Sequence, residues 1–599
     1  MAIKERSEIA EKYKWNLTIM YKDDQAWHRD FEKLAKEIKA FSKFKGIFTV
    51  DANTLADALR ASDEISRQFE KLASYAMRKS DEDTRNTIGT ELKSKITSLG
   101  VEFGENASFF EPELIELGWD KIGSYIKTNT TLKVYRHYLA NILRYKPHIL
   151  SLAEEKILAS TNEITSTANN VFTKLNNADI KFGDIKDEKG NVIELSKGNY
   201  GKYVASQDRA VRKNAFETLY KSYKDLKNTF AETLIGDIKA NYFMSKSRKY
   251  KNPLAMSLYN NNIDIKVYDN VINTINNNLD KMHKYVAMKK EVLGLQDFHM
   301  YDFYVDLIKE YDVEYEYEDA LKIIFGALKP LGSDYINNAK KIFDERWIDV
   351  FECKGKMAGA YSSFGYDTPP YILLNYNGKL DSVGTIIHEL GHSMHSYYSA
   401  LKKPYIYHEY SIFVAEVASN VNEMLLNMYM LDNAKDNQER LSLINDFLES
   451  IKGSIYRQGM FAEFEKKIYE LEGSKQTLTE ETLSNLYYDL NKKYYGDAIV
   501  PDDDIRYEWM RIPHLYYQFY VYQYATGLTA AFFIARDLYQ GNAGMKEKYI
   551  EFLSSGSSDY PLDLLKRLGI DMNSEEPINR ILEYFDKKID EFSRIIKEK

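Results

Sequence analysis

The sequence predicts a mainly α-helical protein, and three observations support this prediction. Only 11 prolines and 29 glycines interrupt the 599 residues, so long helices can run without a break. Apolar residues recur at three- and four-residue spacing through most of the chain, whereas strand-like patterns are confined to two short stretches. Apolar residues make up 44% of the chain, which is enough for more than one ordinary core of about 100–200 residues.

Composition also excludes several classes of protein. The net charge of −9 argues against a general nucleic-acid-binding protein, which needs a basic surface. The single cysteine, Cys353, excludes a disulfide framework. No signal peptide is visible, and apolar stretches such as 529–535 are far shorter than the roughly 20 residues of a spanning helix. We therefore expect a cytoplasmic protein with neither a nucleic-acid nor a membrane partner, and leave the oligomeric state open.

The first third of the chain has the periodicity of successive helices. From residue 25 to about 110 the apolar positions follow helical spacing, and Asp51 stands where it can cap one of the helices. Similar patterns continue to about residue 178 and contain no cluster of histidines or cysteines, so this part is predicted to be structural. Residues 180–196 predict a β-hairpin around the turn at 187–190, and helices resume after Tyr203.

The most informative helix follows a short β-prone region. Residues 359–376 predict one or two short strands, and Asp381 can cap a helix over 381–399. On that helix His388 and His392 are four residues apart and project from one face, which is the HExxH pattern. Two such imidazoles can bind one zinc ion, and Glu389 can act as general base toward a zinc-bound water.

A catalytic zinc ion needs a third protein ligand. The metzincin spacing requires glycine at 395 and histidine at 398, but these are His395 and Tyr398. Thermolysin-like and aminopeptidase-like spacings require a glutamate at 411 or 412, which are serine and isoleucine. The helix predicted over 412–431 offers Glu416, 28 residues after His388. The small residues Ala418 and Ser419 beside it allow a close approach of the two helices, so Glu416 is the predicted third ligand.

Three further side chains near this site have roles that the sequence leaves open. Glu423 lies on the same stripe as Glu416 and is either an acid that orients a ligand histidine or an ordinary carboxylate. His395 lies about one turn, roughly 5 Å, beyond the pair and is predicted to pack rather than to bind metal. His408 lies in a tyrosine-rich loop and either contacts substrate or is structural.

A second candidate segment lies near the C-terminus, in the run RIPHLYYQFYVYQYATG. Pro513 suits the first turn of a helix, and Tyr516 and Tyr522 would point away from its polar stripe. That stripe would carry His514, Tyr517, Tyr520 and Tyr524. These groups either donate hydrogen bonds to the oxyanion that forms when a peptide bond is attacked, or they are core aromatics.

The HELGH helix, the FVAEVAS helix and the histidine–tyrosine segment together resemble the thimet-oligopeptidase-like zinc metallopeptidases, in their bacterial oligoendopeptidase F branch. The resemblance extends from the YKWNL segment near the N-terminus to LLKRLGIDM near the C-terminus. It implies a two-lobed helical fold that encloses a deep substrate channel. From the strand-like stretches we add a small sheet and a β-hairpin near the active-site lobe, and we divide the chain into an N-terminal helical region at 1–112, a helical and hairpin region at 113–200 and the catalytic domain at 201–590.

The resemblance assigns roles to matching residues. One zinc ion per chain would be held by His388, His392 and Glu416, with Glu389 as base and Glu423 as the acid behind a ligand. The histidine and tyrosines that stabilise the transition state would map onto the 514–524 segment, where the candidates are His514, Tyr517, Tyr520 and Tyr524. Alignment at His514 places Phe519 where animal members carry a key tyrosine, whereas a one-residue shift places Tyr520 and Tyr524 instead. Independently of the resemblance, we expect Gly359, Ala360, Tyr361 and His408 to bind substrate, and either the strand at 371–376 or its neighbour near Gly359 to pair with an extended peptide.

The expected function is zinc-dependent endopeptidase activity on short unstructured oligopeptides. One alternative is a zinc carboxypeptidase on the same fold, which would need Arg511 or Arg506 to hold the substrate's terminal carboxylate. The other is a non-catalytic peptide-binding scaffold, against which the intact Glu389 and the complete ligand set argue.

Overall fold

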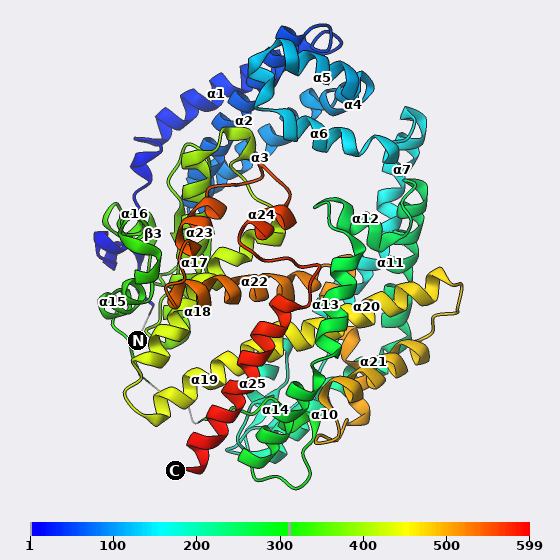
Figure 1. Cartoon of the computed structure of the whole chain (residues 1–599), viewed down its shortest axis with the longest axis vertical. Helices are drawn as coiled ribbons and strands as arrows, with labels where there is room; N and C mark the ends of the chain where they lie inside the picture. Colours follow the sequence, from blue (N-terminus) through cyan, green and yellow to red (C-terminus); the bar gives the residue numbers. More distant parts are fainter. Residues whose placement is uncertain (1–2, 309–312, 599) are drawn as a thin grey trace. The chain divides into compact units, whose positions relative to one another are not determined.

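The computed structural model describes residues 3–308 and 313–598, which form two compact units. Unit 1 comprises Met1–Pro147, Asp312–Met430 and Ile534–Ile570, and unit 2 comprises His148–Tyr311, Leu431–Phe533 and Asp571–Lys599. Each unit therefore mixes early, middle and late parts of the chain. Figure 1 colours the chain along its sequence, from blue at the N-terminus to red at the C-terminus. The predicted regions 1–112, 113–200 and 201–590 are each contiguous in the chain, whereas the units are assembled from interleaved segments. The division into these regions stays a prediction.

Unit 1 is helical apart from one small sheet. Its first segment holds α1 (Asp24–Phe41), α2 (Ala52–Asp81), α3 (Thr87–Ala107), α4 (Phe110–Leu117), α5 (Trp119–Thr128) and α6 (Arg136–Arg144). Its later segments hold α15 (Tyr317–Ala327), α16 (Gly332–Asp344), α17 (Leu380–Lys402), α18 (Ile412–Asp432), α23 (Met545–Leu553) and α24 (Pro561–Arg567).

Unit 2 has the same helical character. It holds α7 (Leu152–Thr165), α8 (Thr167–Lys174), α9 (Lys197–Val204), α10 (Arg209–Asp225), α11 (Lys227–Ser247), α12 (Pro253–Tyr259), α13 (Ile265–Asn276) and α14 (Leu279–Val292). Its remaining helices are α19 (Asn437–Ile451), α20 (Gln458–Gly473), α21 (Glu480–Tyr495) and α25 (Glu576–Lys597). The helix α22 (Tyr522–Tyr539) begins in unit 2 and continues into unit 1.

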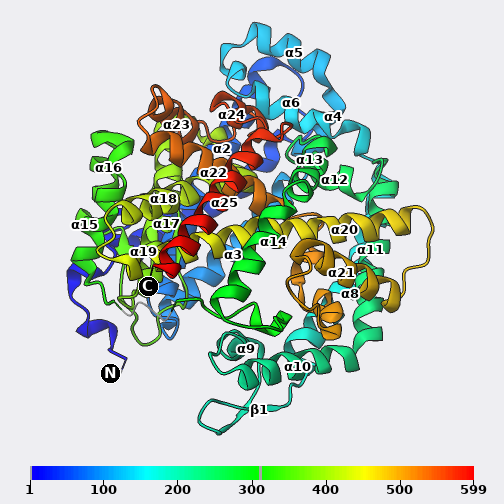
Figure 2. The ribbon, with the colours of Figure 1, turned by 60° about the horizontal axis from the view of Figure 1, so that its bottom comes forward.

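Two small sheets complete the fold. The predicted hairpin forms from β1 (Asp184–Lys186) and β2 (Val192–Glu194), with Ile185 opposite Ile193, and it projects beside α9 and α10 in unit 2 (Figure 2). The strands predicted over 359–376 are β4 (Tyr361–Ser363) and β5 (Tyr371–Leu373) in unit 1. They join β3 (Ile348–Asp349) in the order β3-β5-β4, where β5 is parallel to β3 and antiparallel to β4.

The central position of β5 corrects one expectation. Both of its edges are occupied and Tyr371, Ile372 and Leu373 are fully buried, so this strand cannot pair with a substrate peptide. The edge strand β4 keeps that possibility open.

Helix caps test the local predictions. The Asp51 carboxylate accepts the backbone N–H groups of Asn53 and Thr54 at 2.8 and 2.9 Å, so this predicted cap is confirmed. Asp381 is not the cap of α17, which begins one residue earlier at Leu380 after Lys379. Its carboxylate lies in the first turn instead, where the positive end of the helix dipole stabilises it.

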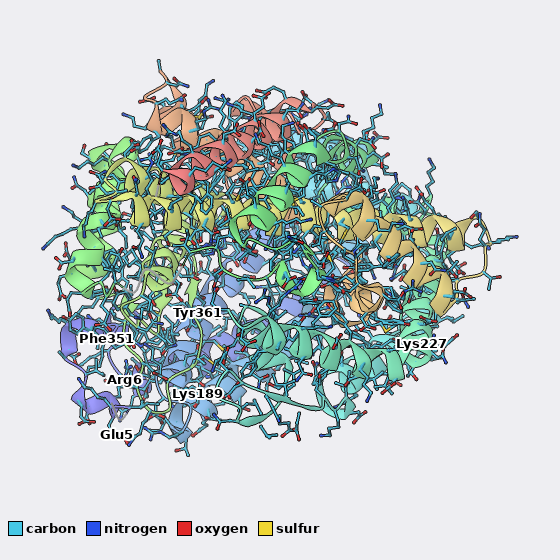
Figure 3. All side chains as sticks on the ribbon, turned by 90° about the horizontal axis from the view of Figure 1, so that it is seen from below. Glu5, Arg6, Lys189, Lys227, Phe351 and Tyr361 are labelled. Carbon is cyan, nitrogen blue, oxygen red and sulfur yellow. The ribbon has the colours of Figure 1, made fainter. Side chains whose placement is uncertain are left out.

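The N-terminal segment is attached to the small sheet of unit 1. Arg6 pairs with the buried Asp349 of β3 at 2.6 Å, and Lys356 lies 2.8 Å from the other oxygen of that carboxylate. Figure 3 shows Arg6 beside the segment that carries Phe351. In the part of the chain that the structure describes, no helix has both the length and the apolar character needed to cross a membrane.

Candidate active site

The helices α17 and α18 pack unusually closely, because small residues face each other across the contact. A Cβ atom on Gly391 would lie 2.6 Å from the Cα atom of Ser419 and 2.7 Å from the carbonyl oxygen of Ala418. The Asn422 side chain also donates to the Ile387 carbonyl at 3.1 Å. The close approach predicted from the small residues is therefore present, and it brings Glu416 to the HExxH face.

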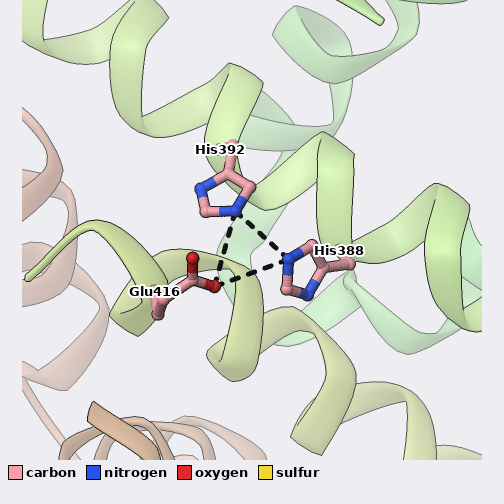
Figure 4. A group of neighbouring side chains, drawn as sticks. All are labelled: His388, His392 and Glu416. Carbon is pink, nitrogen blue, oxygen red and sulfur yellow. Dashed lines mark hydrogen bonds and ion pairs between the residues drawn. The ribbon is translucent and has the colours of Figure 1, made fainter. Parts of the chain in front are cut away.

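Three ligand atoms converge at this contact, as Figure 4 shows. The Nε2 atoms of His388 and His392 are 3.2 Å apart, and Glu416 Oε2 lies 3.5 and 3.6 Å from them. A tetrahedral zinc ion with bonds of about 2.0–2.2 Å places its ligand atoms roughly 3.3–3.6 Å apart. The two imidazoles and the carboxylate therefore fit such an ion.

Carboxylate and hydroxyl groups behind the cluster orient its members. Glu423 Oε1 lies 2.9 Å from His388 Nδ1, which leaves Nε2 of that ring facing the cluster. Burial lowers the pKa of His388, but the hydrogen bond and charge of Glu423 raise it above its ordinary value overall. Burial and the charge of His388 lower the pKa of His392. Ser419 donates to Glu416 Oε2 at 3.1 Å.

Glu389 is 8% exposed and lies beside the first ligand on α17. Burial raises the pKa of its carboxyl group, and the backbone N–H of Ser362 on β4 donates to it. The Ser362 hydroxyl also bonds to the Ser393 hydroxyl at 2.8 Å, which joins β4 to α17. Sequence reasoning missed Ser362, because nothing local distinguishes a strand amide that meets a helix carboxylate.

The other two histidines of this region are buried within unit 1. His395 is 1% exposed and stacks on Tyr410 with 3.6 Å between ring centroids, and burial lowers its pKa to about 3. His408 is 4% exposed, and its Nε2 atom lies 3.3 Å from Glu70. Burial lowers the pKa of His408, but Glu70 raises it overall, as expected for an ion pair. Glu409 lies near this pair, so the three side chains form a second group of possible metal ligands. The ion pair of His408 with Glu70 explains why these two side chains lie together without a metal ion.

The residues predicted to bind substrate near β4 differ in their surroundings. Gly359 and Ala360 are exposed, and the Gly359 carbonyl accepts a bond from Asn375 at 2.8 Å. Tyr361 is half-buried and donates from its hydroxyl to Asp81 at 2.7 Å. Their role toward a peptide stays a prediction.

The prediction of a helix from Pro513 onward is wrong. A short 3-10 turn covers Pro513–Tyr516, and α22 begins only at Tyr522. Gln518 and Phe519 between them have φ angles of +50° and +60°, which a right-handed helix excludes. Contacts with other helices of unit 2 hold this conformation, and local periodicity does not report such contacts.

The predicted group of side chains nevertheless comes together in unit 2. The Tyr524 hydroxyl lies 3.3 Å from His514 Nε2, and the His514 ring lies 5.5 Å from Tyr517 and 6.3 Å from Tyr520 between centroids. Burial lowers the pKa of His514. Tyr516 and Tyr522 point elsewhere, as predicted.

The two off-stripe tyrosines lie in the core of unit 2. Tyr516 bonds to the Thr233 hydroxyl at 2.8 Å and stacks on Phe172. Tyr522 is 2% exposed and packs against Tyr268.

Known proteins resemble this chain over nearly its whole length. The model of Peptidase family M3 matches residues 203–584, and the model described as Oligopeptidase F matches residues 113–182. Oligopeptidase PepF of Bacillus subtilis is 42% identical over 99% of this chain and 88% of its own length. An oligoendopeptidase F homolog of Lactococcus lactis is 39% identical over 99% of each chain.

Solved structures give the same result. Oligoendopeptidase-F from Enterococcus faecium matches with a TM-score of 0.74 and 34% identity, over 96% of this chain and 100% of that one. A protein from Chlamydophila abortus matches with a TM-score of 0.94 and 36% identity, over 99% and 100%. Fold and site therefore define a helical metallopeptidase with peptide substrates. The chain belongs to peptidase family M3, as the motifs indicated.

Proposed function

We propose that this peptidase is a zinc-dependent endopeptidase that cleaves internal bonds of short, unstructured oligopeptides. The observation that supports it most directly is the convergence of His388, His392 and Glu416 at tetrahedral spacing, with Glu389 beside them. Two nitrogen ligands and one carboxylate oxygen are the donor set typical of a catalytic zinc ion, which leaves a fourth position open. We propose one zinc ion per chain.

In this mechanism the zinc ion would polarise the scissile carbonyl and lower the pKa of the attacking water. Glu389 accepts the proton of that water and passes it to the leaving nitrogen. A raised pKa suits both halves of this task, since the carboxyl group must first take the proton and then release it. Glu423 holds the His388 ring in the orientation that presents Nε2.

We also propose that the cluster around His514 serves the same reaction by donating hydrogen bonds to the oxyanion. A tyrosine hydroxyl or an imidazole N–H strengthens its bond as negative charge develops, so its effect belongs to the transition state. The edge strand β4, which follows the exposed Gly359 and Ala360, is proposed to pair with the substrate backbone. Backbone hydrogen bonds do not depend on the substrate's side chains, so this pairing favours broad specificity.

The carboxypeptidase alternative is less well supported. Arg506 pairs with Asp503 at 2.8 Å, and the Arg511 charge lies over the Tyr200 ring at 5.0 Å from its centroid. Both guanidinium groups thus already have partners in unit 2.

An internally quenched peptide blocked at both ends tests the proposal. Wild-type protein should cleave it, chelator should abolish cleavage, and added zinc should restore it. Glu389→Gln should keep the metal, measured by elemental analysis, and lose about a hundredfold or more in kcat. Cleavage of free-ended peptides alone would favour the carboxypeptidase, and activity unaffected by chelator would contradict the metal mechanism.

A further inference from the structure

The loop before α22, which carries Tyr517 and Tyr520 of the proposed catalytic cluster, contains two consecutive residues in the left-handed conformation, Gln518 and Phe519. The other described non-glycine residues with positive φ stand singly, at Lys249, Asn262, Arg346 and Lys475. A side chain in this region costs free energy, and such a conformation persists only where the surroundings hold it. The pair lies directly between Tyr517 and Tyr520.

Three helices of unit 2 hold this pair. Glu465 on α20 accepts the Phe519 backbone N–H at 2.7 Å, and Asn241 on α11 accepts the Gln518 side-chain amide at 2.5 Å. Ser257 on α12 donates to the Gln518 carbonyl at 2.6 Å. Each anchor comes from a different helix, so the loop conformation is fixed from three sides.

The anchor at Glu465 is buried in apolar surroundings. Glu465 is fully buried and Phe519 is 1% exposed, with the Phe519 ring 4.6 Å from Tyr469 and 5.7 Å from Tyr268. Burial raises the pKa of Glu465 to about 8. A buried carboxyl group is costly in such a place. Its Oε1 atom accepts the Phe519 N–H of the loop, which gives the carboxyl group a specific use there.

Asn241 belongs to the same buried network. Its side-chain amide donates to Asp237 at 2.9 Å and to the Tyr469 hydroxyl at 2.8 Å, and this orients its oxygen toward Gln518. The loop is thereby connected to α11 and α20 by a continuous chain of hydrogen bonds.

We infer that Glu465, Asn241 and Ser257 are positioning residues for the tyrosine cluster. By holding Gln518 and Phe519 left-handed, they set the directions in which Tyr517 and Tyr520 leave the loop toward His514. The three anchors do not touch substrate and act only through the loop. This inference rests on the proposed role of the His514 cluster, and it names the residues that build that cluster.

Glu465→Leu removes the acceptor and keeps a side chain of similar volume. We expect kcat to fall about ten- to a hundredfold with KM within about twofold, since displacement of a donor by about 1 Å has effects of this size. Zinc content should be unchanged. Hydrogen exchange at the Phe519 amide, which needs no substrate, should become faster because its bond is lost.

Matched variants separate positioning from general stability. Glu465→Gln keeps a carbonyl oxygen for the Phe519 amide and should restore most of kcat. Glu463→Leu removes another buried acid from α20, one that bonds to Lys493 and Tyr494 instead of the loop. It should lower Tm at least as much as Glu465→Leu while kcat stays near wild type.

The kcat of a double variant tests most directly whether Glu465 acts through the tyrosines. If Glu465 acts through Tyr520, Glu465→Leu combined with Tyr520→Phe should be no slower than the slower single variant. Losses that are additive with both Tyr520→Phe and Tyr517→Phe would overturn the inference, as would faster exchange at Phe519 with unchanged kcat. If Glu465→Leu does not fold, Ser257→Ala should still lower kcat several-fold, and its failure to do so would equally overturn it.

The failure of the proposed function has a different signature. If His514→Ala, Tyr517→Phe, Tyr520→Phe and Tyr524→Phe all leave kcat unchanged, the cluster has no catalytic role, and the positioning inference falls with it. If those variants lose activity while Glu465→Leu and Ser257→Ala both keep it, only the positioning inference is wrong.

Discussion

At the scale of single residues, Glu423 is predicted to act on the metal only through His388. Glu423→Ala removes the carboxylate 2.9 Å from His388 Nδ1 and frees the ring to rotate. Zinc affinity should fall about ten- to a hundredfold, measured by competition with a chelator of known affinity. Glu345→Ala, at an exposed position of the same unit, is the control and should bind zinc normally. Unchanged affinity in Glu423→Ala would contradict this role.

A second residue-scale prediction concerns pH. The pKa of Glu465 is about 8 in the folded protein and 4.5 ordinarily, so between these values the folded state retains a proton that the unfolded state has lost. The free energy of unfolding therefore falls as pH rises through this interval. The facing groups are the Phe519 N–H, which lowers the pKa of Glu465, and Asp237, which raises it further and whose own pKa is raised to about 7 by burial.

Glu465→Gln cannot titrate, so its stability should depend less on pH. The Tm difference between variant and wild type should grow in favour of the variant from about pH 5 to about pH 9. Asp237 is present in both proteins, and its titration largely cancels in the difference. Parallel Tm profiles would show that Glu465 titrates normally.

At the scale of elements, the contact of α17 with α18 is predicted to depend on Gly391. Gly391→Ala places a methyl group against the backbone of Ser419, which cannot move aside as a side chain could. The helices must separate, at a cost of about 1–3 kcal/mol in stability, and Glu416 should move away from the histidines with loss of zinc affinity. Thermal unfolding and zinc titration measure both effects.

Gly384 offers the matched control on the same helix. Nothing lies within 4 Å of a Cβ atom built there. Gly384→Ala should therefore keep zinc affinity and raise stability by about 0.5–1 kcal/mol, because alanine favours helix. Equal tolerance of both substitutions would contradict the close helix contact.

The loop before α22 and the first turn of that helix give the second prediction at this scale. If Tyr520 or Tyr524 donates to the oxyanion, its change to Phe should lower kcat about a hundred- to a thousandfold while KM and zinc content stay nearly constant. Tyr516→Phe and Tyr522→Phe alter buried tyrosines that point elsewhere and should keep kcat. If all four variants behave alike, the tyrosines are core aromatics.

At the scale of the whole molecule, family membership predicts selectivity for substrate size. Short unfolded peptides should be hydrolysed, whereas a stable folded protein should survive prolonged incubation with the enzyme. Mass spectrometry of both mixtures measures this. The same folded protein after denaturation and alkylation is the control and should be cut. Efficient cleavage of the native protein would contradict an enclosed channel.

Local spacing in the sequence is enough to propose much of the candidate site. His388 and His392 share a face through helical periodicity alone, and Glu416 was predicted as third ligand because small residues beside it allow close packing. The hairpin and the short strands were also visible as breaks in helical spacing. The helix after Pro513 was predicted wrongly because periodicity continues through a segment where the backbone reverses.

Sequence by itself determined the helical class and the HExxH face, which depend on residues near one another in the chain, and the family, which motifs at 388–392, 413–419 and 514–524 together indicate. Tertiary structure alone decided that β5 is a central strand and that interleaved segments build each unit. It also decided the left-handed pair at Gln518 and Phe519, whose partners on α11, α12 and α20 lie far away in the sequence. The physical reason is that burial and long-range hydrogen bonds can stabilise a backbone conformation that local preferences oppose.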